Sequence, residues 1–223
     1  MPLEVDHAFI ACATGAPEAK ALLQLGFVEG SSNTHAGQGT ANRRFFFDNF
    51  MLELLWVTDP AEAQSGQTRR TRLWDRCEQR EAGASPLGIV FRGSEVPPGP
   101  QQAPFPTWSY TPSYLPAGVS IYVAEGTKLD EPELFYLPFL KRAATRNSEP
   151  VAHALPIRRI CGLAVGILRF ADLSEPSRRA QADGLLAYFE SPRPVLEIIF
   201  EGPPDMKVDL RPELPLIFRG TSN

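Results

Sequence analysis

The sequence has no long hydrophobic run and little cysteine, and both absences narrow the kind of protein that it encodes. No apolar stretch approaches the roughly 20 residues that a membrane-spanning helix needs. The first residues, Met1–Asp6, show neither the basic nor the apolar region of a signal peptide. Cys12, Cys77 and Cys161 are an odd number at wide spacing, which fits no zinc motif and no disulfide framework. We therefore expect a cytoplasmic protein with reduced thiols and no membrane partner.

The chain also lacks an excess of positive charge. Its 223 residues include 22 Lys and Arg against 26 Asp and Glu, which gives a formal net charge of −4. Binding to nucleic acid depends on a basic surface, so this composition argues against a nucleic-acid partner. Hydrophobic residues make up 43% and charged residues 22% of the chain, close to the average of soluble domains. We expect one large folded domain or two small ones packed together.

Proline, in contrast, is abundant at 22 of 223 residues, which is about twice its average share. Proline interrupts helices and central strands, so loops or sheet edges are expected where it clusters. The clusters are Val96–Pro116, Pro132–Pro156, Pro192–Pro204 and Pro212–Pro215. The first third of the chain is nearly free of proline, and its pattern is therefore the clearest.

The first 60 residues predict the order strand, helix, strand, strand, strand. An apolar strand over Val5–Ile10 contains one histidine, and a helix over Ala16–Leu25 ends at Gly26. The three later strands are expected at Phe27–Gly30, Arg43–Phe47 and Met51–Val57. A polar segment over 59–82 then indicates a connecting helix on the surface.

The rest of the chain predicts further strands and one short helix. Strands are expected at 86–92, 119–124, 133–139, 160–170, 185–189, 195–201 and 214–219, and a helix at 175–182. Three strands share one shape, with a single glutamate inside an apolar run: Glu53, Glu133 and Glu197. Since side chains alternate between the two faces of a strand, each glutamate faces water or a cavity that uses a carboxylate.

Several of these segments together resemble a known family. They are Val5–Ile10, the helix that ends at Leu25-Gly26-Phe27, the segment His35–Asn42, and Leu52-Glu53-Leu54. The resemblance is to glyoxalase-like domains of the vicinal oxygen chelate superfamily, strong over 5–57 and looser over 85–201. The His-x-Gly-x-Gly-Thr-x-Asn motif is similar to one subfamily of largely uncharacterised bacterial proteins.

This resemblance implies an α+β fold in which paired β-α-β-β-β modules form a curved mixed sheet around a pocket. The first module is expected in residues 1–60 and a linker helix in 61–84. The second module, with insertions, is expected in 85–201, and a C-terminal strand segment in 202–223.

The resemblance also implies a metal site, since metal-using members carry ligands on the first and fourth strands of each module. His7 matches the first-strand ligand and Glu53 the fourth-strand carboxylate of the first module. The second module leaves two alternatives. If it begins at 86–92, Gly88 or Ile89 stands at the ligand position and Glu133 is the carboxylate.

If the second module instead begins at 160–170, Cys161 or Gly162 stands at the ligand position and Glu197 is the carboxylate. Either way the chain departs from the full ligand set. At most one histidine and two glutamates remain as ligands, and these could hold a divalent metal whose identity the sequence does not give. The alternative is that His7 has a structural role and is hydrogen-bonded at the end of its strand.

Glu53 and the glycine loop after His35 are the other candidates for chemistry. A carboxylate in an apolar pocket suits a general base, whereas the alternative for Glu53 is contact with solvent or with Arg43 or Arg44. The loop lacks the third glycine of a dinucleotide site and the Gly-Lys-Ser/Thr of a P-loop, so no nucleotide cofactor is expected. Its alternative is a plain hairpin connection.

We therefore expect Glu53 and His35 to be catalytic. Residues expected to bind substrate are Thr40, Asn42, Arg43, Trp108 and Tyr110, although Arg43 and Arg44 face opposite ways, so at most one points inward. The implied function is a lyase, isomerase or dioxygenase-like enzyme acting on a small oxygenated molecule, with a homodimer as one expectation. The alternative is a protein that binds or sequesters a small molecule without turnover.

Overall fold

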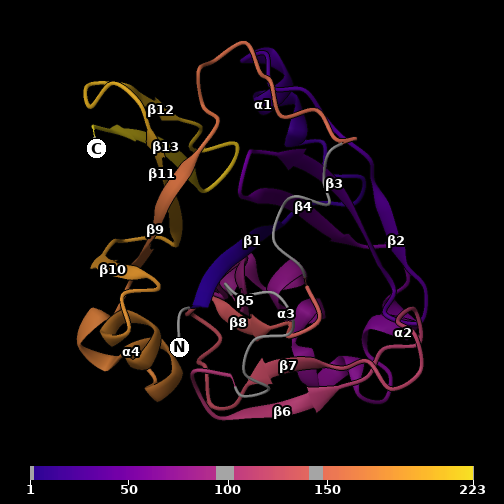
Figure 1. Ribbon diagram of the computed structural model, residues 1–223. Helices are drawn as coiled ribbons and strands as arrows, with labels where there is room; N and C mark the ends of the chain where they lie inside the picture. The colour runs from indigo at the N-terminus through magenta and orange to yellow at the C-terminus, as the bar shows by residue number, and fades with distance from the viewer. Residues whose placement is uncertain (1–2, 94–102, 141–147, 223) are drawn as a thin grey trace.

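The computed structural model describes residues 3–93, 103–140 and 148–222, and its strands form two sheets (Figure 1). The larger has eight strands in the order β2-β3-β4-β1-β5-β8-β7-β6, and the smaller has five in the order β10-β9-β11-β13-β12. The larger sheet contains β1 (Leu3–Ala11), β2 (Asn33–His35), β3 (Thr40–Phe46), β4 (Met51–Val57), β5 (Leu87–Gly93), β6 (Thr107–Tyr110), β7 (Ile121–Ala124) and β8 (Glu133–Tyr136). The smaller contains β9 (Ile160–Ile167), β10 (Ala187–Glu190), β11 (Val195–Glu201), β12 (Lys207–Asp209) and β13 (Leu216–Thr221).

The helices are short. They are α1 (Ala19–Gln24), α2 (Pro60–Ala63), α3 (Leu73–Glu78) and α4 (Glu175–Ala182), with single 3₁₀ turns η1 (Thr68–Thr71), η2 (Arg80–Ala82) and η4 (Phe170–Asp172). The predicted linker helix over 61–84 is thus a series of short turns. Within the described ranges, no helix has both the length and the apolar character needed to cross a membrane.

The first module has the predicted order of β1, α1, β2, β3 and β4, and one strand is displaced. The second strand was expected at Phe27–Gly30, but β2 forms at Asn33–His35 instead. Gly26 takes a positive φ of 80° after the helix, and Phe27 then packs into the core with 3% of its surface exposed. Gly30 makes one backbone hydrogen bond to Arg44, and the regular ladder with β3 starts only at Asn33.

The second module repeats this arrangement around the centre of the larger sheet. β1 and β5 pair antiparallel in the middle, and each is flanked by a parallel partner, β4 beside β1 and β8 beside β5. The strands of this sheet end at Tyr136, and β9 begins the smaller sheet. The expected second module over 85–201 therefore covers strands of both sheets. Which strands pair with which is not visible in the sequence pattern, so the boundary between the sheets was not predicted.

One hydrophobic core joins the two sheets. It contains Phe27, Phe45 and Phe47 from the first module together with Phe200 and Phe218 from the smaller sheet. The rings of Phe27 and Phe218 stack with their centroids 5.1 Å apart. Because the sheets share this core, they pack as one body, as Figure 1 shows by the proximity of β9 and β11 to the first module.

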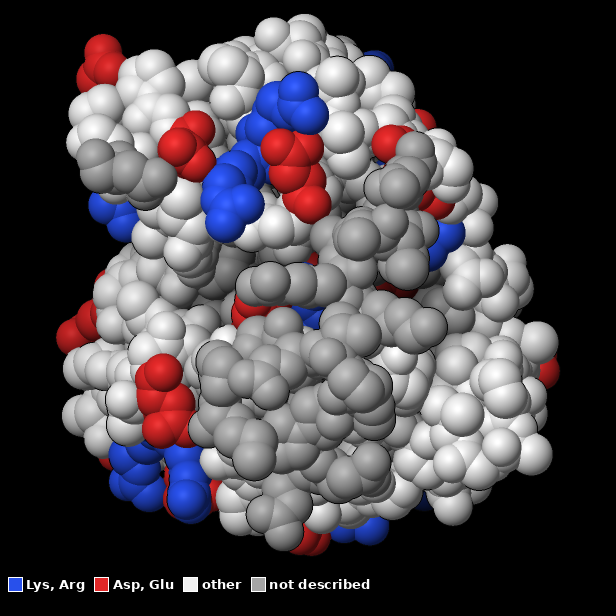
Figure 2. Space-filling view, in the orientation of Figure 1, with Lys and Arg blue, Asp and Glu red and all other residues white. Residues whose placement is uncertain are grey.

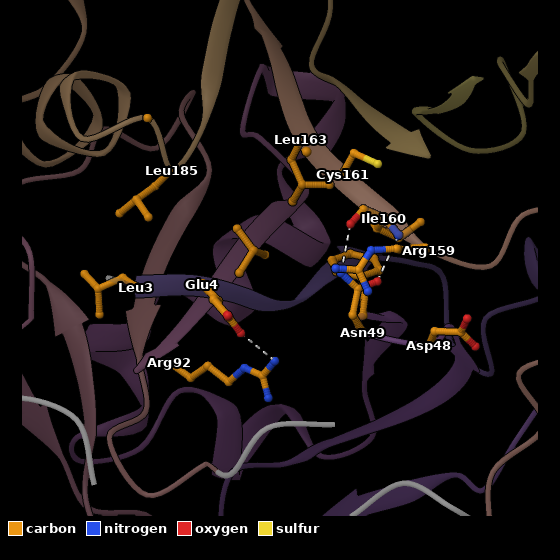
Figure 3. A pocket seen from close by; sticks show the side chains of 14 residues that line it. Leu3, Glu4, Asp48, Asn49, Arg92, Arg159, Ile160, Cys161, Leu163 and Leu185 are labelled. Atoms are coloured by element: carbon orange, nitrogen blue, oxygen red, sulfur yellow. Dashed lines mark hydrogen bonds and ion pairs between the residues drawn. The ribbon is translucent and has the colours of Figure 1, made fainter. Parts of the chain in front are cut away.

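Asn49, in the turn between β3 and β4, also ties the sheets together (Figure 3). Its Nδ2 donates to the carbonyl of Ile160 at 2.8 Å, and its Oδ1 accepts from the amide of Ile160 at 2.9 Å. We expect Asn49→Ala to lower the free energy of unfolding by about 1–3 kcal/mol, because two backbone groups of β9 lose their partners. Urea unfolding against the wild type measures this loss. Asn49→Asp, which keeps the acceptor but sets a carboxylate oxygen against the carbonyl of Ile160, is not expected to recover it.

His153 gives the fold a dependence on pH. Its Nδ1 accepts from the amide of Val28 at 3.1 Å and its Nε2 contacts the carbonyl of Phe46 at 3.0 Å, so the folded state needs the neutral ring. Burial lowers the pKa of His153 below its usual value. As the pH falls through about 6.5, the unfolded chain therefore takes up a proton before the folded protein does, and stability is lost.

We expect His153→Gln to lose less stability than the wild type between pH 7.5 and pH 5. The difference in proton uptake on unfolding is at most one proton. Urea midpoints measured at both pH values test this, and parallel pH profiles of the two proteins would contradict it.

Candidate functional site

A cavity of about 400 Å³ opens on one face of the larger sheet. The strands β1, β3 and β4 of the first module form one side, and β5, β7 and β8 of the second module form the other. The side from the first module is mainly polar, and the side from the second module is mainly apolar. The predicted residues His7, His35, Asn42, Glu53 and Tyr110 all line this cavity.

A bulge in β1 places two consecutive side chains at this cavity. The register between β1 and β5 shifts between Val5 and His7, so Asp6 is the extra residue. In a regular strand Asp6 and His7 would face opposite ways, but a bulge turns a side chain out of this alternation. Both residues line the cavity, and Nδ1 of His7 lies 2.8 Å from Oδ2 of Asp6.

The contact with Asp6 sets the proton position on His7. Since a carboxylate only accepts hydrogen bonds, Nδ1 of His7 carries the hydrogen and Nε2 of the neutral ring has a free lone pair. Nε2 lies 3.8 Å from Oε2 of Glu53. Asp6 itself is 2% exposed and lies 3.4 Å from Nε of Arg92. His7 is therefore an oriented imidazole that faces the Glu53 carboxylate.

Glu53 lies on β4 with 5% of its surface exposed. The amide of Asn42 on β3 donates to its Oε1, and Oδ1 of Asn42 accepts from the backbone amide of Asn33 at 2.7 Å. These contacts fix the orientation of the Asn42 amide and hold the carboxylate in place. Asn42 thus contacts Glu53, and its role in the site is to position that side chain.

The two adjacent arginines of β3 face opposite sides of the sheet. Arg44 lines the cavity, where its guanidinium donates to the carbonyl of Ser31 at 2.6 Å. Arg43, which was expected to bind substrate, lies on the other face and binds Glu29 at 2.5 Å. Strand alternation explains this placement, and the arginine at the cavity is Arg44.

His35 on β2 belongs to a buried chain of hydrogen bonds. Tyr114 donates to Oε1 of Gln38, and Nε2 of Gln38 donates to Oγ1 of Thr40 at 2.7 Å. Oγ1 of Thr40 lies 2.9 Å from Nδ1 of His35. Thr40, expected to bind substrate, is fully buried, does not line the cavity and contacts the ring of His35.

This chain favours one tautomer of His35. A threonine hydroxyl that accepts from Gln38 still has its own hydrogen to donate, and Nδ1 of His35 is the acceptor within reach. With Nδ1 as an acceptor, the neutral ring carries its hydrogen on Nε2. Burial lowers the pKa of His35, although the nearby Glu53 opposes the shift, so the ring is neutral at pH 7.

Aromatic and aliphatic side chains form the other side of the cavity. The rings of Phe9 and Phe135 lie 5.8 Å apart, and Val90, Ile121 and Leu137 continue the same surface. Tyr110 reaches this side as expected from the sequence. Trp108 is placed outside the cavity, where the guanidinium of Arg70 lies 4.4 Å from its ring centroid.

The second-module carboxylate, Glu133, is held by two arginines. Nη2 of Arg72 lies 2.5 Å and Nη2 of Arg76 3.1 Å from its Oε2, and Thr127 donates to its Oε1. Both Arg76 and Glu133 are buried, at 0% and 1% exposure. The carboxylate that the family resemblance assigned to a metal therefore has a guanidinium ion as its partner.

Phe9 closes the other ligand position of the second module. A Cβ atom on Gly88 would lie 2.1 Å from the Phe9 ring, so the ring fills the space above this glycine. In the larger sheet the first strand of the second module is β5, which carries Gly88 and Ile89, the two residues named as alternatives for the ligand position. Cys161 lies on β9 of the smaller sheet.

The four residues expected to bind metal thus do not come together. His7 and Glu53 meet in the cavity, whereas Glu133 is bound by arginines and Glu197, on β11, pairs with Arg219 at 3.2 Å. In the part of the chain that the structure describes, no group of three or more His, Cys, Asp or Glu side chains is placed to hold a metal ion. The residues present do not fit the metal site that the family implies.

A second cavity, of about 530 Å³, lies between the two sheets (Figure 3). Arg92 and Glu4 from the larger sheet face it from one side and Cys161 from the other, and Nη2 of Arg92 lies 3.0 Å from Oε2 of Glu4. The sequence contained no signal for this cavity, because it forms where the sheets meet.

On the face of the molecule seen in Figure 2, acidic and basic side chains are interspersed.

Comparisons with known proteins agree with this architecture. The family described as a glyoxalase-like domain matches residues 5–126, which is more than half of the 223 residues. No curated protein matches the sequence. A solved structure of a hypothetical protein from Staphylococcus aureus has a TM-score of 0.53 at 10% identity, with 100% of both chains covered.

A variant of 4-hydroxymandelate synthase from Streptomyces coelicolor gives a TM-score of 0.42 at 16% identity, over 98% of this chain and 62% of that chain. The α+β fold and the match of the family over the first module and the beginning of the second lead to one conclusion. The chain belongs to the glyoxalase-like domain family.

Proposed function

We propose that this protein is an enzyme that moves a proton on a small carbonyl compound, with Glu53 as the base. The observation that carries the proposal is the placement of the Glu53 carboxylate, which is 5% exposed, fixed by Asn42 and faced by His7 Nε2 at 3.8 Å. A positioned carboxylate in a semi-apolar cavity is suited to general-base catalysis. No step of the proposal passes through a metal ion.

The proposed step balances with the groups in the cavity. Glu53 takes a proton from the carbon next to a carbonyl, the C–H electron pair moves into the carbonyl, and an enolate forms. The hydrogen on Nε2 of His35 stabilises the oxygen of that enolate. Return of the proton to the same carbon gives exchange, and its return to a neighbouring atom gives isomerisation. The second outcome corresponds to the isomerase class expected from the sequence.

The second candidate function is binding without turnover. The observation that favours it is the loss of the second half of the family site, since Phe9 covers Gly88 and arginines hold Glu133. A cavity of about 400 Å³ with apolar walls binds small molecules whether or not it transforms them.

Deuterium exchange separates the two candidates. The protein is incubated in D₂O with acetophenone, phenylacetone or cyclohexyl methyl ketone, and loss of the α-proton signal is followed by NMR. We expect exchange faster than in buffer alone for at least one ketone, unchanged after treatment with EDTA. Exchange with none of them contradicts the proposal and leaves the binding function. Exchange that EDTA abolishes and a divalent ion restores contradicts the metal-free step.

A further inference from the structure

The side chains that line the cavity restrict the charge and shape of a ligand that can bind there. Among the described side chains that face it, the ionic groups are the carboxylates of Asp6, Glu53 and Glu149 and the guanidinium of Arg44. Asp6 lies next to Arg92 and His7, and Glu149 accepts from the amide of Ser31 at 3.0 Å. Glu53 differs from both, because an amide and an imidazole at 3.8 Å are the partners that face it.

Arg44 does not balance the charge of Glu53. Its Nε and Nη2 both donate to Ser31 at 2.6 Å, and its guanidinium lies 5.3 Å from the centroid of the Phe46 ring. These contacts hold the positive charge at the edge of the cavity near β2. Among the described side chains, Glu53 therefore makes no ion pair with a lysine or arginine, and its negative charge repels a carboxylate or phosphate that reaches it.

The space between Glu53 and His7 also favours a hydrogen donor. Oε2 of Glu53 only accepts, and in the neutral form of His7 that donates from Nδ1 to Asp6, Nε2 is an acceptor as well. These two acceptors, 3.8 Å apart, have no hydrogen to share, so they form no hydrogen bond with each other. A group with polarised N–H, O–H or acidic C–H bonds satisfies both atoms when it lies against them.

The opposite side of the cavity requires a compact apolar body. Phe9, Val90, Ile121, Phe135 and Leu137 present a continuous surface of rings and branched side chains. This surface stands where the family would place the ligands of the second module, so apolar contact replaces coordination there. A single ring or a short branched chain fits this side better than an extended polar chain.

We infer that the ligand is an uncharged molecule with one hydrogen-donating polar end, held at Glu53 and His7, and a compact apolar body, and that the cavity rejects anions of the same shape. This inference rests on the proposed function only in placing the polar end at Glu53. It specifies the substrate class that the proposed reaction leaves open.

Binding of shape-matched probes tests the inference. Isothermal titration calorimetry compares 3-phenylpropanamide, which is neutral, with 3-phenylpropanoate, which is its anion of the same shape, and with propanamide, which lacks the ring. We expect the neutral phenyl amide to bind at least about tenfold tighter than the anion, because like charges juxtaposed without compensation are strongly unfavourable. It is expected to bind at least about tenfold tighter than propanamide, because the ring is removed from water.

Two variants attribute the preference to Glu53. In Glu53→Gln the gap between amide and carboxylate is expected to narrow to less than about threefold, since the repelling charge is gone. In Arg44→Gln the preference for the amide is expected to remain. Circular dichroism tests whether both variants are folded. If Glu53→Gln is unfolded, the wild type and Arg44→Gln still test the preference for the amide over the carboxylate.

Three results would overturn the inference. They are a carboxylate that binds the wild type as tightly as the amide, a ring that adds nothing to affinity, and no measurable binding of the phenyl amide. Because binding is measured without turnover, the outcome is independent of the reaction. A protein that prefers the amide but exchanges no proton contradicts the proposed function alone, and one that exchanges protons but prefers the anion contradicts the inference alone.

Discussion

Replacing Glu53 by glutamine is expected to slow α-proton exchange by about 10²–10⁴-fold while the protein stays folded. Glutamine has the shape of glutamate, and its Oε1 still accepts the hydrogen bond from Asn42. What it lacks is a basic oxygen to take the proton. The carboxylate is 5% exposed, so its removal also relieves the desolvation of a charge, and we expect unchanged or higher thermal stability.

The matched control for this variant is Glu190→Gln. Glu190 is an exposed glutamate on β10 of the smaller sheet, so the same chemical change occurs away from the cavity. Its exchange rate is expected to equal that of the wild type. If Glu53→Gln retains exchange within a few-fold of the wild type, Glu53 is not the base.

The second large effect is expected from Arg76→Met. Nη1 of Arg76 donates to the carbonyls of Ser85 at 2.9 Å and Glu131 at 2.7 Å, and its Nη2 lies 3.1 Å from Glu133. Loss of one partner leaves the buried Glu133 carboxylate with less compensation, at an expected cost of about 3–5 kcal/mol in the free energy of unfolding. Urea unfolding of the variant and the wild type measures this cost.

Two companion variants show whether the effect arises from the buried ion pair. Arg76→Met combined with Glu133→Gln is expected to lose less than the sum of the single variants, since the charge that needed compensation is gone. Arg70→Met breaks a pair with Glu125 whose side chains are 55% and 60% exposed, and its cost is expected to stay within about 1 kcal/mol. Equal losses at Arg70 and Arg76 would show that burial of the pair is unimportant.

The local patterns of the first module were sufficient to predict most of its strands. The apolar run Met51–Val57, with Glu53 as its one polar residue, and the apolar run around His7 each correspond to a strand of the structure. α4 and β11 have the predicted bounds, because Ser174 caps the helix and the glutamate-containing run 195–201 is apolar on both sides of Glu197. The short edge strands β6 and β12 were missed, because three or four residues carry too little periodicity.

The site was only partly predictable, because part of it depends on pairing between strands and not on the pattern within one strand. The family resemblance assigned Glu53 and His7 to one site, and strand alternation separated Arg43 from Arg44. Asp6 was not identified, because a regular strand would turn it away from His7, and the bulge that brings it to the cavity depends on pairing with β5. Trp108 and Tyr110 lie two residues apart on β6, with their ring centroids 6.0 Å apart, but Tyr110 alone of the two lines the cavity, and the sequence pattern does not separate them.

The sequence by itself determined the class of the fold and most strands of the first module, because these follow from the local order of apolar and polar residues. The family resemblance of its motifs pointed to the carboxylate and the histidines that line the cavity. Only the tertiary structure decided the fate of the three strand glutamates, which look alike in the sequence. Glu53 meets His7, Glu133 meets Arg72 and Arg76 from the connecting segment, and Glu197 lies on a different sheet. Their partners come from distant parts of the chain, and contacts of that kind are set by packing and not by local pattern.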